Sequence, residues 1–366
     1  MGPICRLKDL TTEELHLRFA DLGVPIALTR QVQIAALRQG KLPQRLPGHS
    51  TKLLRAIGQV AEIPHLVLLE KSVSSQDGFA KYLFRGEDAE PFEAVRIPLL
   101  HRPQDAKYVV CVSSQVGCGL GCAFCATARL GFRRNLAAWE IVDQVIKIRD
   151  DSPHPVRGVV CMGMGEPMLN YERVLRAAKI LCDPCGLAIS GKAITISTAG
   201  VVPGIRRFTA ERHPYRLVVS LTSADPDCRG ELMPIEKAYP LDELMEAVWD
   251  YHRASGRRVT LAWTMISGVN TRRQDAQALA RLIDGMPITL DLIDVNDPSG
   301  RFRPPSREEL NAFRDDLREL VAMPVARRYS GGQDIAGGCG MLAGGMVGRE
   351  EHGRAADGPQ AREFPS

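Results

Sequence analysis

The stretch GCGLGCAFCATARLGF, residues 117–132, places three cysteines in a C-x3-C-x2-C frame: Cys118, Cys122 and Cys125. Glycines separate them, so the backbone can wrap closely around a bound group. A structural zinc site needs four ligands, and the residues up to Arg134 offer no further His or Cys. A cubane iron–sulfur cluster held by three thiolates keeps one iron open, and an open iron can bind a substrate. Buried structural cysteines are the alternative, but this spacing favours a cluster with a reactive iron.

The rest of the chain has the composition of a globular protein. Of its 366 residues, 45% are hydrophobic and 25% charged, and the net charge of +4 permits an anionic partner without demanding one. No apolar run reaches the length of a membrane span, and the N-terminus becomes charged too early for a signal peptide. We therefore expect a cytoplasmic protein with no membrane partner, whose ten cysteines are free thiols, metal ligands or catalytic groups.

Beyond residue 107, short apolar runs alternate with amphipathic helical patterns. The expected strands are residues 108–114, 157–165, 193–198, 216–222, 259–266, 288–294 and 326–330. The expected helices are residues 137–150, 171–183, 240–255, 272–284 and 306–320. This alternation predicts an α/β fold with a parallel sheet, closed or partly closed as a (β/α)6-type barrel. Polar residues follow several strands, at the edge where such barrels carry their chemistry.

The flanking segments differ from the barrel pattern. Residues 1–75 read as a small helical accessory domain, whose first helix opens with the capping box Thr11-x-x-Glu14. Residues 76–106 predict a β-hairpin with an acidic turn and a linker. The barrel domain is expected to span residues 107–345. The remaining residues, 346–366, are polar and aperiodic, which predicts a disordered tail.

Several motifs resemble one known family. The cysteine frame, with Phe124 in its last gap, and GMGEP at 163–167 resemble motifs of the radical S-adenosylmethionine (SAM) superfamily. Within it, residues 111–136 and the stretch GGQDIAGGCGML resemble the RlmN/Cfr family of radical SAM RNA adenine methyltransferases. Further similar stretches run in order across residues 93–345. The resemblance implies a partial radical SAM barrel, a [4Fe-4S] cluster and SAM as cofactors, and RNA as the partner.

The resemblance also implies roles for individual residues. Cys118, Cys122 and Cys125 would hold the cluster. The positions that would contact SAM are Gly165, Glu166, Ser197, Ser220, Leu221, Thr222 and Asn296. Cys339 would accept a methyl group from one SAM, and a radical made from a second SAM would activate that S-methyl group for addition to the adenine ring. Glu93 would then remove the ring proton, and Cys111 would release the base through a transient disulfide with Cys339.

This sequence departs from the family pattern in three places. Thr222 stands where the family commonly has His, and Ala199 where it commonly has Ser. Around Asn296 the chain reads LIDVNDPSG instead of an aromatic residue and prolines. We interpret the chain as a divergent member. The expected target is an adenine of ribosomal RNA, transfer RNA or both, with carbon 2 favoured over carbon 8 of the ring.

Other features leave alternatives open. The helical domain either packs against the barrel or contacts RNA, and five arginines either meet phosphates or are solvated: Arg129, Arg133, Arg134, Arg301 and Arg303. The pair Cys182 and Cys185 is interpreted as incidental rather than a second metal site. The family implies a flavodoxin-like electron donor, and a monomer is the default. The competing hypotheses are a radical SAM enzyme with the same two-cysteine chemistry on another substrate, and an iron–sulfur electron carrier or RNA-binding module.

Overall fold

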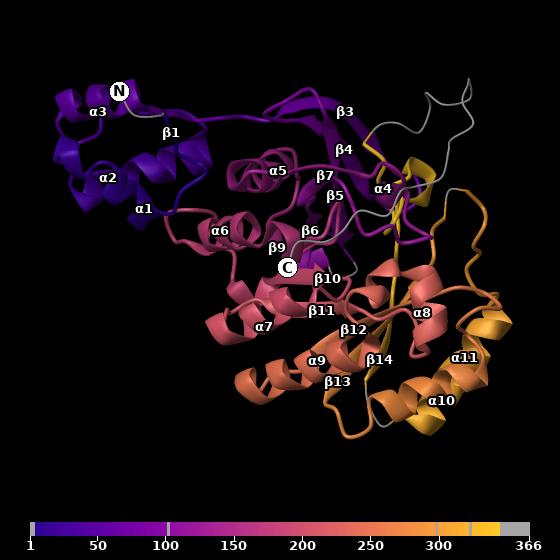
Figure 1. The fold of residues 1–366 in the computed structure, drawn as a ribbon. Helices are drawn as coiled ribbons and strands as arrows, with labels where there is room; N and C mark the ends of the chain where they lie inside the picture. Colours follow the sequence, from indigo (N-terminus) through magenta and orange to yellow (C-terminus); the bar gives the residue numbers. More distant parts are fainter. Residues whose placement is uncertain (1–3, 101–102, 298, 322–323, 345–366) are drawn as a thin grey trace.

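The computed structural model describes residues 4–100, 103–297, 299–321 and 324–344 (Figure 1). The tail expected to be disordered, residues 346–366, lies outside these residues. The described chain is built on a ten-stranded sheet with the order β14-β13-β12-β11-β10-β9-β6-β5-β4-β3. Its two outermost strands, β14 and β3, do not pair with each other, so the sheet is an open barrel rather than a closed one.

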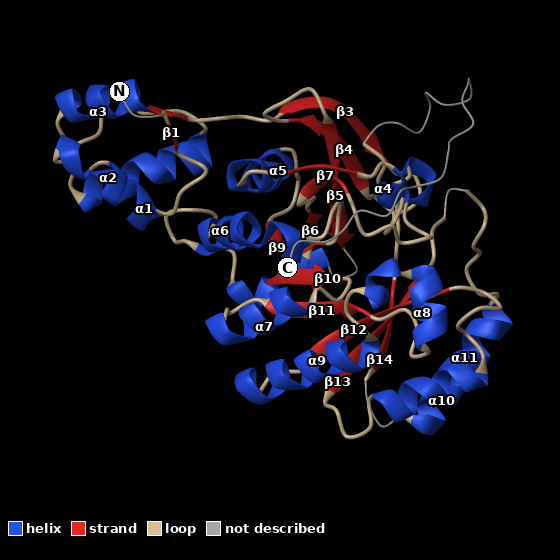
Figure 2. Cartoon of the chain, viewed as in Figure 1, coloured by secondary structure: helices blue, strands red, loops and turns tan. Residues whose placement is uncertain are grey.

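The parallel part of the sheet confirms the expected α/β barrel. Its strands are β6 (Lys107–Cys111), β9 (Val156–Cys161), β10 (Ile194–Thr198), β11 (Arg216–Ser220), β12 (Val259–Met265), β13 (Ile288–Asp294) and β14 (Val325–Arg328). The helices between them are α5 (Ala138–Asp150), α6 (Tyr171–Cys182), α7 (Val202–Glu211), α8 (Pro226–Leu232), α9 (Leu241–Ser255), α10 (Arg273–Leu282) and α11 (Arg307–Leu320). In Figure 2, α5, α6, α7 and α9 follow one another along one side of the strands.

The sequence pattern predicts every one of these strands, but it misses two helices, α7 and α8. Helix α7 contains Pro203 in its first turn and Gly204 next to it. Neither residue favours a helix, but Pro is tolerated in the first turn. A Cβ at Gly204 would lie 2.8 Å from the Cβ of Met168, so the glycine allows close packing against the preceding segment. Tertiary packing therefore outweighs the weak local preference.

The antiparallel part of the sheet extends the barrel on the side of β6. Its strands are β3 (Val67–Val73), β4 (Ala80–Arg85) and β5 (Pro91–Leu99), and β5 pairs antiparallel with β6. The expected hairpin is therefore present as β4 and β5. The strand β3 differs from our expectation, which placed residues 67–73 in the helical domain. Because β3 is an exposed edge strand, its apolar residues do not alternate with polar ones and give no strand signal.

The N-terminal residues form a helical unit with a core of its own. Its helices are α1 (Thr12–Arg18), α2 (Ile26–Ile34), which continues into a π-helical turn at Ala35–Gln39, and α3 (Thr51–Val60). The capping box at Thr11 is present as predicted. The short strands β1 (Cys5–Arg6) and β2 (Ala61–Glu62) join the two ends of the unit. Figure 1 shows this unit beside α5 and α6, away from β13 and β14 at the other end of the sheet. The domain boundaries stay a prediction.

Several polar contacts attach this unit to the barrel, among them those made by Lys8 and Arg38. The ammonium of Lys8 lies 2.6 Å from a carboxylate oxygen of Asp143 on α5, and both side chains are fully buried. Arg38 donates hydrogen bonds to the carbonyls of Pro184 and Gly186. The turn after α6, which contains Cys185, therefore serves as a docking point for the helical unit. Among the described residues, no helix has the length and apolar character that a membrane crossing requires.

Candidate active site

A cavity of about 870 Å³ fills the inside of the open barrel. It is within the size range of small-molecule sites. Ten of the residues singled out from the sequence line it: Cys111, Cys118, Cys122, Cys125, Gly165, Glu166, Ser197, Ser220, Asn296 and Cys339. Three others do not line it: Glu93, Leu221 and Thr222. The barrel thus brings together residues from segments more than 200 positions apart.

The three cysteines lie on a loop between two short antiparallel strands, β7 (Gln115–Gly117) and β8 (Phe132–Asn135). Gly117 has a φ of +71°, and a Cβ there would lie 1.8 Å from the carbonyl oxygen of Gly131. Only glycine fits this position. The amide of Cys118 donates to the same carbonyl at 3.1 Å. The base of the loop is therefore fixed by backbone contacts that leave no room for a side chain.

The environment of the three thiols fits a cationic cluster. Burial raises the pKa of Cys118 to about 12, and it raises that of Cys122 well above its ordinary value. The charge of Cys125 adds to both shifts, which places the three sulfurs near one another. Such thiols become thiolates only when a positive group binds them. In the described part of the chain, no three His, Cys, Asp or Glu side chains are arranged to hold a single metal ion.

Glu166 links the cysteine hairpin to two neighbouring segments. Its carboxylate accepts hydrogen bonds from the amides of Met168 at 3.0 Å and Ala199 at 2.8 Å. Its own amide donates to the side chain of Gln115 on β7. Burial raises the pKa of Glu166 to about 7 in spite of these hydrogen bonds. A carboxylate has further lone pairs, so Glu166 can still accept a bond from a cationic group in the cavity.

The other residues expected to contact SAM fall into two groups. Ser197 is the second-last residue of β10 and Ser220 the last residue of β11, and both line the cavity. Leu221 and Thr222 are buried behind that wall. Thr222 has a φ of +61°, a strained conformation for a β-branched residue, and among the described residues its hydroxyl has no hydrogen-bond partner. The position where the family commonly has His is thus strained and incompletely bonded in this chain.

Cys339 lies on an exposed loop that a polar network holds in place. Its amide donates to the hydroxyl of Ser330 at 2.9 Å. The side-chain amide of Asn296 donates to the same hydroxyl at 2.8 Å and to the carbonyl of Cys339 at 3.3 Å. Gln333 in turn donates to the side-chain oxygen of Asn296. Asn296, predicted as a SAM contact, therefore also positions the Cys339 loop.

Cys111 is the last residue of β6 and is buried beneath this loop. Burial raises the pKa of its thiol far above the ordinary value, and the neighbouring Cys339 thiol adds to the rise. The loop of Cys339 also touches the cysteine hairpin, because the amide of Ala126 donates to the carbonyl of Gly340 at 2.7 Å. Two thiols and the three-cysteine loop thus share one end of the cavity.

Known proteins are similar to this chain in sequence and fold. The model of the radical SAM superfamily matches residues 112–283. A probable RNA methyltransferase of Myxococcus xanthus is 47% identical over 96% of this chain and 98% of its own length. A dual-specificity RNA methyltransferase RlmN of Syntrophobacter fumaroxidans is 38% identical over 93% of this chain and 98% of its own. The solved structure of a radical SAM methyltransferase from Sphaerobacter thermophilus superposes with a TM-score of 0.84 at 36% identity, covering 93% of this chain and 99% of that one.

The chain belongs to the RlmN family of radical SAM RNA methyltransferases. The expected enzyme class and fold are therefore confirmed. An iron–sulfur electron carrier or a non-enzymatic module is the wrong interpretation, since relatives that span the whole chain are methyltransferases.

In this RlmN-family enzyme, Glu93 does not reach the cavity wall. It lies on β5 with its side chain 2% exposed. One carboxylate oxygen accepts hydrogen bonds from the amides of Ala343 at 2.7 Å and Gly344 at 3.0 Å. The other lies 3.1 Å from the ammonium of Lys81. Glu93 therefore ties the segment after Cys339 to the antiparallel strands.

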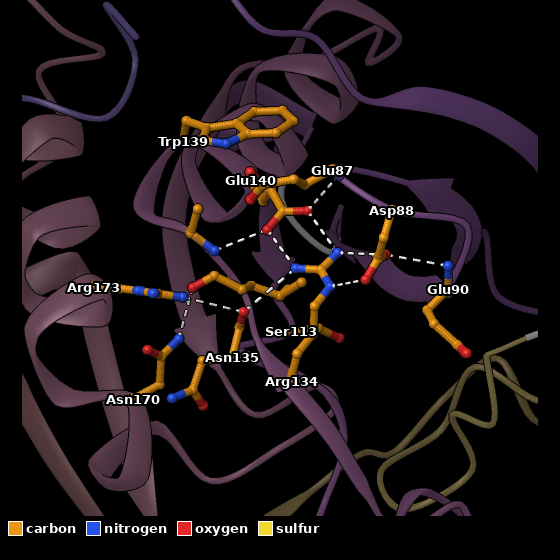
Figure 3. Close-up of polar contacts among 12 residues, drawn as sticks. Glu87, Asp88, Glu90, Ser113, Arg134, Asn135, Trp139, Glu140, Asn170 and Arg173 are labelled. Carbon is orange, nitrogen blue, oxygen red and sulfur yellow. Dashed lines mark hydrogen bonds and ion pairs between the residues drawn. The ribbon is translucent and has the colours of Figure 1, made fainter. Parts of the chain in front are cut away.

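The arginines that the sequence suggested for phosphate binding lie outside the cavity of the RlmN-family enzyme, and two of them are engaged elsewhere. Arg129 pairs with Asp297. Figure 3 shows the guanidinium of Arg134 between Glu140 on α5 and Asp88 in the acidic turn of the β4–β5 hairpin, at 2.7 Å and 2.5 Å. The acidic turn thus fastens the end of the cysteine hairpin. Other basic residues line the cavity: Lys107, Arg157, Lys192, Arg216, Arg327 and Arg328.

Sequence reasoning missed four of these cavity residues because each was a single basic residue at or next to the start of an expected strand. What these residues have in common is their position near the start of a strand. Lys107 and Arg216 begin β6 and β11, Arg157 is the second residue of β9, and Lys192 comes two residues before β10. The starts of neighbouring parallel strands meet at one edge of a sheet, so residues at equivalent places are brought together.

Proposed function

We propose that this enzyme methylates an adenine ring carbon, carbon 2, of ribosomal RNA, transfer RNA or both, through an S-methylcysteine at Cys339. The observation that carries the proposal is the joint position of Cys339 and Cys111. Both line the cavity that the three cysteines of the C-x3-C-x2-C loop also line. A relative named a dual-specificity RNA methyltransferase agrees with more than one RNA target.

The residues that would hold the cofactors follow from the same cavity. Cys118, Cys122 and Cys125 would bind a [4Fe-4S] cluster, and Gly165, Glu166, Ser197 and Ser220 would surround SAM, with Asn296 at the edge of that site. When bound, the cluster and SAM supply a methyl group, an electron and a carbon radical that can remove a hydrogen atom from an S-methyl group.

The chain's own groups then carry the methyl carbon through the reaction. The sulfur of Cys339 accepts the methyl group, and its activated carbon becomes bonded to the adenine ring. The adduct on the ring gives up one electron, which would return to the cluster. Glu93 takes the proton from the ring carbon, which requires its hydrogen bonds to Ala343 and Gly344 to open first. The thiolate of Cys111 attacks the sulfur of Cys339. A sulfur–sulfur bond forms, the sulfur–carbon bond breaks, and the carbon takes a proton to become the methyl group.

The cellular setting is part of the same proposal. A transient Cys111–Cys339 disulfide and an RNA substrate suit the cytoplasm, where thiols are kept reduced. The electron would come from a flavodoxin-like protein, and the enzyme would act as a monomer, because one described chain contributes all the site residues named above.

The test uses the Cys111→Ala variant, expressed in cells and purified under denaturing conditions. Without the resolving thiol, the bond between Cys339 and RNA should persist, and sequencing the attached RNA names the target. The matched control is the Cys111→Ala/Cys339→Ala double variant, which should carry no RNA. A methyl group on Cys339 without RNA would retain the first step and exclude the RNA adduct. An unmodified Cys339 in chains that contain iron and sulfide would exclude the two-cysteine mechanism.

A further inference from the structure

The end of the cavity opposite the cysteines is strongly basic. Four cationic side chains line it near the starts of adjacent strands: Lys107, Arg157, Lys192 and Arg216. The register brings these strand starts together. Arg216 on β11 pairs with Thr195 on β10, and a Cβ at Gly158 on β9 would lie 3.1 Å from the carbonyl of Ala193. The basic residues therefore form a continuous rim, which we call the amino-terminal rim.

Most of this positive charge has no partner in the part of the chain that the structure describes. Lys107 pairs with Asp105. Arg157, Lys192 and Arg216 are exposed, and within the described residues their side chains make no ion pair or hydrogen bond. Among the described residues, the only carboxylates that line the cavity are Asp294, which pairs with Arg327, and Glu166 at the far end. Three solvated cations facing one opening make a site for an anion with several charges.

The cavity connects this rim to the thiols over a suitable distance. Arg216 and Ser220 are the ends of β11, as Lys107 and Cys111 are the ends of β6, and four residues of parallel strand span about 13 Å. The wall between them is uncharged, with Val109, Val160 and Thr195. This span is comparable with one nucleotide flipped out of its strand, whose phosphates stay outside while its base enters a pocket.

We propose that RNA docks on the amino-terminal rim, where Arg157, Lys192 and Arg216 bind the phosphates that flank the target nucleotide. The flipped base enters the barrel through this opening and meets Cys339 from the side opposite the cluster loop. This inference rests on the proposed function and adds the docking surface and the direction of entry. Phosphate contacts of this kind position the strand without reading its sequence.

The test is made in the Cys111→Ala chain, which traps RNA on Cys339. The Arg157→Gln, Lys192→Gln and Arg216→Gln variants and their triple combination are expressed in it, and mass spectrometry measures two fractions of Cys339. One fraction carries RNA and the other carries only the methyl group. We expect the RNA-bound fraction to fall several-fold, most in the triple variant, while the methyl-bound fraction rises. The control is Arg281→Gln on α10, an exposed arginine that does not line the cavity and should change neither fraction.

The outcomes separate this inference from the proposed function. If the parent carries RNA and the rim variants carry the same amount, the rim does not dock RNA and only the inference fails. If both fractions fall together, the rim acts through folding or cofactor loading, and the inference is wrong. If the parent carries a methyl group but no RNA, the proposed function itself fails.

A second measurement reports the contacts directly. The trapped RNA sequence, once known, is titrated against the wild-type enzyme and each rim variant at several salt concentrations. Each lost phosphate contact should reduce the slope of log affinity against log salt by roughly 0.7 to 0.9, whereas Arg281→Gln should leave the slope unchanged. An unchanged slope in the triple variant would overturn the inference.

Discussion

At the scale of single residues, the two proposed catalytic thiols have contrasting surroundings. Cys339 is exposed on a loop, whereas Cys111 is buried at the end of β6. An exposed thiol can receive a methyl group and then approach a base. A buried thiol with a raised pKa stays protonated, so it does not compete for the methyl group. The surroundings of Cys339 therefore suit a methyl carrier, and those of Cys111 suit a resolving thiol.

The raised pKa of Cys111 predicts how product release depends on pH. Below that pKa the reactive thiolate is a minor form, and its fraction grows about tenfold for each pH unit. Release of RNA from Cys339 should therefore accelerate from about pH 7 to about pH 9, which acid-quenched samples of the wild-type enzyme can measure. A rate that does not change over this range would mean that a nearby base, and not the solvent, takes the Cys111 proton.

Glu93 offers a second test at this scale. If its carboxylate removes the ring proton, Glu93→Gln should trap RNA on Cys339 even though Cys111 is present. The amide oxygen of Gln can still accept from Ala343, so the loop should keep much of its position. Denaturing purification followed by RNA detection makes the measurement. Glu90→Gln, in the exposed acidic turn, is the control and should trap none. Loss of the Cys339 methyl group without trapping would show that Glu93 only holds the loop.

The sequence could identify Asn296 as a site residue, but it could not show that Asn296 positions the Cys339 loop. A resemblance to a family assigns each residue to a ligand separately and does not show its contacts with the rest of the chain. The hydrogen bonds of Asn296 reach Ser330 and Cys339, which lie 34 and 43 positions further along the chain. Contacts over such separations follow from the order of the strands, which residue types alone do not specify. The same limit hid the pairing of Arg134 with Asp88, which lies 46 positions earlier in the chain.

At the scale of elements, the hairpin β7–β8 is the frame for the three cysteines. Its geometry depends on the close approach of Gly117 to the carbonyl of Gly131. Arg134, two residues after Phe132, secures the other strand to α5 and to the β4–β5 turn (Figure 3). The loop is thus held at its base and at the start of α5, while its tip faces the cavity.

This geometry makes Gly117→Ala a sharp test. A methyl group there would overlap the Gly131 carbonyl, and a φ of +71° is unfavourable for Ala, so the hairpin must shift. We expect the variant to retain less iron and sulfide per chain, as measured by chemical analysis. Gly119→Ala is the matched control, because its Cβ would meet only Phe132 at an ordinary 3.5 Å. Equal cluster content in both variants would contradict this account.

The elements of the barrel were the most predictable part of the molecule. Strands with a continuous apolar run, such as β11, and amphipathic helices, such as α6, have sequence patterns that are easily recognised. The edge strand β3 was not predictable, since its consecutive apolar residues Val67, Leu68 and Leu69 are all exposed. An element gives no recognisable sequence pattern when its side chains do not enter the core and do not alternate between apolar and polar residues.

At the scale of the whole molecule, the helical unit is fastened by a buried ion pair. Lys8 and Asp143 lie 2.6 Å apart, and Asp143 also accepts from the amide of Leu66 at 2.7 Å. Burial lowers the pKa of Lys8, and the charge of Asp143 counteracts the shift. The pair therefore joins the first residues, the link to β3 and helix α5 at one point.

Removing one partner of this pair should be costly. Lys8→Ala leaves the Asp143 carboxylate buried without its counter-ion, and we expect the free energy of unfolding to fall by about 3–5 kcal/mol. Urea unfolding of the full chain measures it. The control is Arg6→Ala, whose partly exposed pairs with Glu62 and Glu87 are worth about 0–1 kcal/mol. Equal losses in the two variants would mean that Lys8 is no anchor.

The segment around Cys339 has a consequence for how the enzyme is made. Thr127 donates to the carbonyl of Leu342, and Glu93 holds Ala343 and Gly344, so early and late parts of the chain meet there. Cys339 is synthesised about 200 residues after Cys125, a delay of roughly 10 to 40 s on the ribosome. During that time a nascent chain has its cluster loop without the thiol proposed to receive the methyl group. A ribosome that stalls in this interval leaves a chain that has the cluster cysteines and lacks the carrier.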